Sequence, residues 1–95
     1  MGEKRLIEAE VTIVNQAGLH TRPAATMVKL AAKYKSEFYI TKDGMRINGK
    51  SIIGLMTLAA AQGSTLLLEF EGDDPDVENM CKDITDYINR GFDEV

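Results

Sequence analysis

Stretches in which every second residue is apolar constrain the fold of this chain more than any other feature. In the first of them, Glu8 and Glu10 alternate with apolar neighbours, which is the period of a strand with one buried and one wet face. Asp43-Gly44 is a hairpin signal that joins two such stretches. Strands of this kind predict an antiparallel sheet that is covered on one side only. The four predicted strands are residues 6–14, 37–42, 45–48 and 65–71.

Between these strands the apolar spacing changes to three and four residues, the period of an amphipathic helix. The sequence predicts an Ala-rich helix over residues 23–34 and a short one over residues 52–58, with Ser51 as the N-cap of the second. A third helix is predicted to begin with Asp74 as N-cap and to stop at Gly91. The predicted order of elements is therefore βαββαβα.

This order predicts an α+β open-faced sandwich, a four-stranded antiparallel sheet with three helices on one face. The length of 95 residues allows a single domain over residues 1–95. The net charge of −4 disfavours nucleic acid as a partner, and no apolar run approaches the roughly 20 residues of a membrane span. The N-terminal residues lack a signal-peptide core, and the single Cys81 fits a reducing compartment. We expect a cytoplasmic protein without membrane insertion.

The one histidine, His20, lies in "GLHTRPAA" (residues 18–25), where a loop passes into a helix. First-turn amides have no intrahelical acceptor, so those of Thr21, Arg22 and Ala24 are predicted to face an anion. The positive end of the helix dipole disfavours protonation of the ring and keeps it nucleophilic. A phosphoryl group added to the ring would be stabilised by the dipole, the amides and the guanidinium of Arg22. The residues therefore indicate phosphoryl-carrier chemistry at His20.

Other interpretations of His20 stay open at this level. A histidine near a helix start is often an exposed polar residue or a capping group. A hydrolase needs a nucleophile and an orienting acid around the histidine, and the sequence shows no such signature. A metal site needs further ligands, and Cys81 falls in an inward helical stripe. We therefore expect no metal and no cofactor.

Two motifs together, "GLHTRPAA" and "KSIIGLMTLAAAQG" (residues 50–63), resemble the HPr family of the bacterial phosphoenolpyruvate-dependent phosphotransferase system, over nearly the whole chain. The resemblance implies that His20 accepts a phosphoryl group at Nδ1 from phospho-enzyme I and passes it to an enzyme IIA domain, assisted by Arg22. It implies a covalent carrier rather than an enzyme, because the partner enzymes supply most of the catalysis. Ala17 departs from members of the family that carry Asn or Ser there.

Further details of the sequence point to regulation. "KSIIG" resembles HPr proteins whose serine is phosphorylated by HPr kinase/phosphorylase, which implies that Ser51 is a regulatory site, although a helix cap alone would also account for a serine. "VTIVNQAGLH" and "NRGFDE" are similar to the nitrogen-related branch, NPr. The alternative to a sugar-transport carrier is therefore a mainly regulatory protein, controlled through Ser51 or of the nitrogen type, in the extreme with a vestigial His20.

The short second helix carries more apolar side chains than it can bury. Ile52, Ile53 and Met56 are predicted to form part of a docking surface, or else they complete the core. Lys29 and Lys33 lie on one face of the first helix, where they would steer acidic partners or simply be solvated. We expect a monomer that docks to its partners through this surface.

Overall fold

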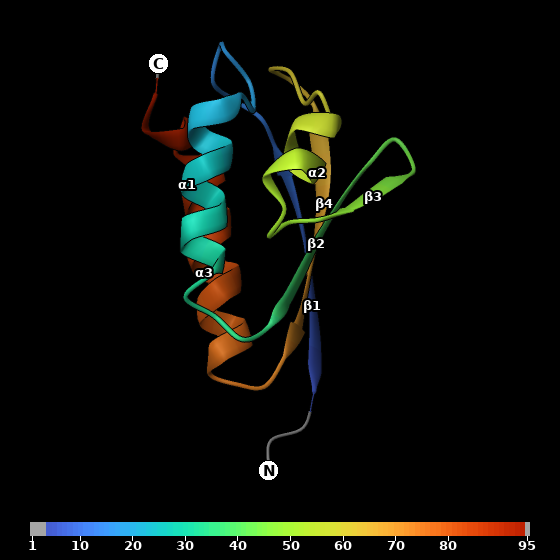
Figure 1. The fold of residues 1–95 in the computed structure, drawn as a ribbon, viewed down its shortest axis with the longest axis vertical. Helices are drawn as coiled ribbons and strands as arrows, with labels where there is room; N and C mark the ends of the chain where they lie inside the picture. The colour runs from blue at the N-terminus through green and yellow to red at the C-terminus, as the bar shows by residue number, and fades with distance from the viewer. Residues whose placement is uncertain (1–3, 95) are drawn as a thin grey trace.

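The computed structural model describes residues 4–94 and shows one four-stranded antiparallel sheet (Figure 1). The strands follow the order β1-β4-β2-β3, so that the first strand pairs with the last. The predicted strand order along the chain is confirmed. The strands are β1 (Arg5–Thr12), β2 (Glu37–Lys42), β3 (Met45–Asn48) and β4 (Thr65–Gly72).

Three α-helices lie on one side of this sheet, and its other face is open, as Figure 1 shows. They are α1 (Thr21–Ala31), α2 (Ile52–Thr57) and α3 (Asp76–Asn89), and a short 3₁₀ turn, η1 (Gly91–Asp93), follows α3. The predicted open-faced sandwich is confirmed. Within residues 4–94, no helix is both long enough and apolar enough to cross a membrane.

The core lies between the sheet and the helices. Leu66, Leu68 and Phe70 of β4 are fully buried, as the alternation predicts. Phe70 pairs across the strands with Phe38 of β2, and the two rings stack with their centroids 4.8 Å apart. Such stacking adds to the free energy gained by removing both rings from water. These contacts join the two central strands on the face that the helices cover.

The ends of several elements differ from the sequence-based prediction. The first helix spans Thr21–Ala31 rather than residues 23–34, and the first strand ends at Thr12. Asp74 was expected to cap the third helix, and this is wrong: the helix begins at Asp76 after Pro75. The carboxylate of Asp74 instead lies 2.9 Å from the guanidinium of Arg5. Asp74 thus forms a long-range ion pair with Arg5 instead of the helix cap that the local sequence pattern predicted.

The loop between β1 and α1, which carries His20, is fixed by a close backbone approach. Gly18 has φ +69°, and a Cβ at this position would lie 2.6 Å from the carbonyl oxygen of Ala60. The N–H of Leu19 donates to that same oxygen at 2.9 Å. A side chain is therefore excluded at Gly18, both by the left-handed backbone and by the segment that follows α2.

Replacing Gly18 by Ala should destabilise the fold more than the same change at Gly63. Gly63 also has a left-handed φ, +89°, but no atom lies within 4 Å of its added Cβ. Both variants bear the left-handed strain of about 1–2 kcal/mol, whereas only Gly18→Ala adds a backbone clash, so it should lose at least about 1 kcal/mol more. Urea unfolding of the two variants measures the difference, and equal losses would contradict the packing described for Gly18.

Candidate functional site

His20 is the N-cap residue of α1, with extended backbone (φ −100°, ψ −173°). Its ring makes no capping hydrogen bond to the helix. Instead Nε2 lies 2.8 Å from Oε2 and 3.0 Å from Oε1 of Glu94, which follows η1. Among the residues that the structure describes, Nδ1 has no hydrogen-bond partner. The geometry therefore contradicts the capping interpretation of His20 and leaves one ring nitrogen available for chemistry.

Arg22 reaches the same carboxylate from the first turn of α1. Its Nη2 and Nε lie 2.6 Å and 3.2 Å from Oε2 of Glu94. The two residues expected to work together, His20 and Arg22, are thus brought together through a third group. Glu94 was not among the residues predicted from the sequence to belong to the site.

Asn15, which was also not predicted to belong to the site, contacts Glu94 from the loop before His20. Its side chain is buried, and Nδ2 donates to Glu94 Oε1 at 2.9 Å and to the carbonyl of Gly18 at 3.0 Å. It therefore ties the loop that carries His20 to the segment after α3. Its Oδ1 is buried without a partner in the part of the chain that the structure describes. The only local signal for such a role is a polar residue in the loop before Gly18.

The surroundings of Glu94 favour the ionised form of its carboxylate. The hydrogen bond from Arg22 lowers the pKa of Glu94 below its ordinary value; burial opposes this shift, and His20 and Asn15 reinforce it. The carboxylate in turn raises the pKa of Arg22, chiefly through the same hydrogen bond. The site at the start of α1 is thus a compact group of opposite charges.

The backbone amides of the first turn are only partly as predicted. The N–H of Ala24 donates to the carbonyl of His20 at 3.0 Å, so the prediction of an unpaired amide at Ala24 is wrong. The reason is the helix boundary: an N-cap carbonyl accepts the first intrahelical bond, and Ala24 lies four residues after the cap. The amides of Thr21 and Arg22 precede that bond, and their role toward an anion stays a prediction.

Ser51 caps the second helix, as the sequence predicts. Its Oγ accepts a hydrogen bond from the N–H of Gly54 at 3.1 Å. The residue is half-buried at the start of α2. The capping interpretation is therefore confirmed, and phosphorylation of this hydroxyl stays a prediction.

The apolar surplus of α2 lies on the surface. Ile52, Ile53 and Met56 are 39%, 77% and 40% exposed, and we call these three residues the α2 patch. Leu55 and Leu58 face the core instead, so the alternative that the patch completes the core is wrong. Figure 1 shows α2 beside the N-terminal half of α1, against which it packs. The patch and His20 therefore belong to neighbouring helices.

The two lysines predicted for the outer face of the first helix are exposed. Lys29 belongs to α1, but the helix ends at Ala31, so the prediction that Lys33 lies on it is wrong, and Lys33 lies in the turn that follows. With Arg22 they add positive charge to a chain whose net charge is −4. The first helix is therefore locally basic in an acidic protein.

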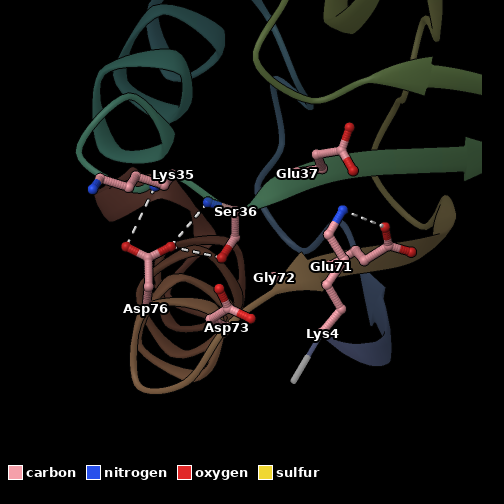
Figure 2. Close-up of a pocket in the computed structure, with 8 residues that line it drawn as sticks. All are labelled: Lys4, Lys35, Ser36, Glu37, Glu71, Gly72, Asp73 and Asp76. Atoms are coloured by element: carbon pink, nitrogen blue, oxygen red, sulfur yellow. Dashed lines mark hydrogen bonds and ion pairs between the residues drawn. The ribbon is translucent and has the colours of Figure 1, made fainter. Parts of the chain in front are cut away.

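A pocket lies at the other end of the molecule. Figure 2 shows it between the start of β1, the α1–β2 loop and the start of α3, where Asp76 accepts hydrogen bonds from the N–H and Oγ of Ser36 at 2.9 Å and 2.6 Å. Neither His20 nor Ser51 lines it. Within residues 4–94, no three His, Cys, Asp or Glu side chains gather as a metal site would require. The candidate site at the start of α1 is thus separate from this pocket.

Comparisons with known proteins agree with this fold. Residues 7–90 match the family described as "PTS HPr component phosphorylation site". The chain is 43% identical over 89 residues to the phosphocarrier protein HPr of Neisseria meningitidis serogroup A, covering 94% of this chain and 98% of that protein. It is 46% identical over 69 residues to the HPr-like protein Crh of Halalkalibacterium halodurans, covering 73% of this chain and 82% of that protein.

A solved structure of an HPr protein has a similar fold. The crystal structure of HPr-C-His from Thermoanaerobacter tengcongensis superposes with a TM-score of 0.86 at 40% identity, covering 94% of this chain and 98% of the other. The sheet order, the histidine at the start of α1 and these likenesses lead to one conclusion. The chain belongs to the HPr family of phosphocarrier proteins of the phosphotransferase system.

Proposed function

We propose that this protein accepts a phosphoryl group on Nδ1 of His20 from phospho-enzyme I and passes it to an enzyme IIA domain. The observation that carries the proposal is the state of the His20 ring: Nε2 is engaged by Glu94, while Nδ1 has no partner among the described residues. In this proposal the protein works as a cytoplasmic monomer, and the enzymes on either side supply most of the catalysis.

The surroundings of His20 favour both steps, acceptance of the phosphoryl group and its transfer to the next partner. As the Nδ1 lone pair forms a bond to phosphorus, the bond from phosphorus to the donor breaks, and negative charge arrives at the helix start. The helix dipole and the amides of Thr21 and Arg22 favour that charge. The guanidinium of Arg22, which is held by Glu94 beside the His20 ring, adds positive charge to the same site. An exposed site allows a second partner to remove the group.

Replacing His20 by Ala should abolish phosphoryl transfer to the chain. Incubated with phosphoenolpyruvate and enzyme I, the native protein should acquire an acid-labile, base-stable label, as a phosphohistidine does, and His20→Ala should acquire none. Ser51→Ala serves as the matched control and should label fully. A label that persists in His20→Ala would contradict the proposal, and labelling of Ser51 by HPr kinase and ATP without any label on His20 would favour the mainly regulatory alternative.

We further propose that the α2 patch, together with Arg22 and Lys29 of α1 and Lys33 of the turn after it, forms the surface that meets enzyme I and enzyme IIA. Exposed apolar clusters often mark interfaces, and the neighbouring cations would attract acidic partner surfaces. Ile53 is the most exposed member of the patch and is the residue whose loss should be felt most in binding and least in stability.

Replacing Ile53 by Asn should weaken binding of enzyme I about tenfold and leave the melting temperature nearly unchanged, because the side chain is 77% exposed. Leu6→Asn is a matched control, since Leu6 is also well exposed but lies on β1 at the far end of the molecule. Isothermal titration with enzyme I measures both affinities. Equal weakening by the two variants would show that the α2 patch has no special role.

Ser51 is proposed as a site for HPr kinase/phosphorylase. A phosphate there would add about −1.5 to −2 charge beside the α2 patch. Because negative charge is tolerated at a helix N-terminus, it should act on docking through repulsion and desolvation and not by unfolding α2.

The variant Ser51→Asp should therefore lower the affinity for enzyme I several-fold while melting near the native temperature, because Asp is also a good N-cap. Ser51→Ala should show the reverse pattern: it loses the bond to Gly54, which costs about 0.5–2 kcal/mol of stability, but keeps its affinity. Thermal melts and enzyme I titrations separate the two. Unchanged affinity with a large loss of stability in Ser51→Asp would contradict the proposal that charge at this position acts on docking.

A further inference from the structure

Glu94 is the group on which the candidate site converges. Its side chain is only 9% exposed, and its two carboxylate oxygens contact nitrogen atoms of three residues in the segment that joins β1 to the first turn of α1. These partners are Nε2 of His20, Nη2 and Nε of Arg22, and Nδ2 of Asn15. An isolated exposed ion pair contributes little, whereas these contacts form a network around one largely buried carboxylate.

The segment after α3 places Glu94 there. Phe92 of η1 is buried, and its ring packs against Tyr87 with the centroids 5.2 Å apart. The N–H of Glu94 donates to the carbonyl of Gly91 at 2.9 Å. The position of the carboxylate is thus set by packing of the backbone that precedes it as well as by its own hydrogen bonds. Figure 1 shows this segment beside the start of α1.

The state of the carboxylate fixes the proton on the His20 ring. The pKa of Glu94 lies below its ordinary value near 4.5, chiefly because of Arg22, so at neutral pH the group is ionised and can only accept hydrogen bonds. Nε2 of His20, 2.8 Å away, must then donate. A neutral imidazole has one N–H, and a proton on Nε2 leaves the lone pair on Nδ1.

We propose that Glu94 is a positioning residue for phosphoryl transfer: it holds His20 in the Nε2–H tautomer, with Nδ1 as the nucleophile, and balances the positive charge that the ring gains on reaction. The tautomer part stands on the contact between Nε2 and an ionised carboxylate, and the kinetic part rests on the proposed carrier function. Orientation of a histidine by a carboxylate on its far nitrogen is a general way to make the near nitrogen reactive.

The charge balance of the step explains the second role. The lone pair of Nδ1 forms the N–P bond, and the electron pair of the bond from phosphorus to the donor leaves with the donor. Nε2 keeps its proton, so the ring becomes an imidazolium that carries the phosphoryl group. The carboxylate of Glu94 faces that new positive charge, whereas the new negative charge arises at the start of α1, where the helix dipole favours it. When the group moves on, both charges disappear together.

The tautomer is tested directly by ¹⁵N NMR of the ring, at a pH of about 9, where an ordinary imidazole is neutral. The native protein should show a single Nε2–H tautomer, and Glu94→Ala should show a mixture of both. Asp93→Asn is the matched control: it removes the same charge one residue earlier, from a carboxylate that pairs with Arg90 and not with His20. A single Nε2–H tautomer in Glu94→Ala would overturn the proposal.

The kinetic role is tested by rapid-quench phosphorylation with phospho-enzyme I. Glu94→Gln keeps an acceptor oxygen but loses the charge, so at saturating phospho-enzyme I it should react at least about tenfold more slowly, whereas Asp93→Asn should stay within about twofold of native. Native-like rates in Glu94→Gln would overturn the positioning role while leaving the carrier function intact. A native protein that accepts no phosphoryl group would overturn the carrier function, whereas the NMR result would still decide the tautomer.

Discussion

The burial of one face of the sheet is the constraint from which the rest of the structure follows. Phe38, Phe70 and their neighbours on the central strands need a cover, and the long helices α1 and α3 supply it from the same side. They run in opposite directions across that face, as Figure 1 shows. The start of α1 and the end of α3 therefore meet at one end of the molecule. Hydrophobic packing thus places His20 beside Glu94, 74 positions away in the sequence.

This origin explains which parts of the molecule were predictable. The alternation of apolar residues predicts the strands because a sheet with one buried face imposes that period on its sequence. Ser51 was predictable as a cap because a cap acts over three residues of chain. His20 and Arg22 were assigned because the chemistry of a helix start is also local.

Most of the wrong or missing predictions concern residues whose partners lie far away in the sequence. Asp74 looks like a cap, but it pairs with Arg5, 69 residues earlier. Glu94 and Asn15 reach the site through contacts that span most of the chain, and no spacing rule connects them. Ala24 is a smaller error of a different kind, since a shift of the expected helix start changes which amide is free. Long-range pairings, and not local propensity, are what the sequence pattern leaves undetermined.

The pairing of the first strand with the last has a consequence for the timing of folding. β1 pairs with β4, so Thr12 has no partner in the sheet until Thr65 has been synthesised. While the chain is being synthesised, its N-terminal strand therefore leaves the ribosome with unpaired backbone groups, and the sheet closes late. Glu94 emerges later still. A nascent chain would carry His20 in a loop without its carboxylate partner while the next 74 residues are made, and the assembled site would arise only after Glu94 has emerged.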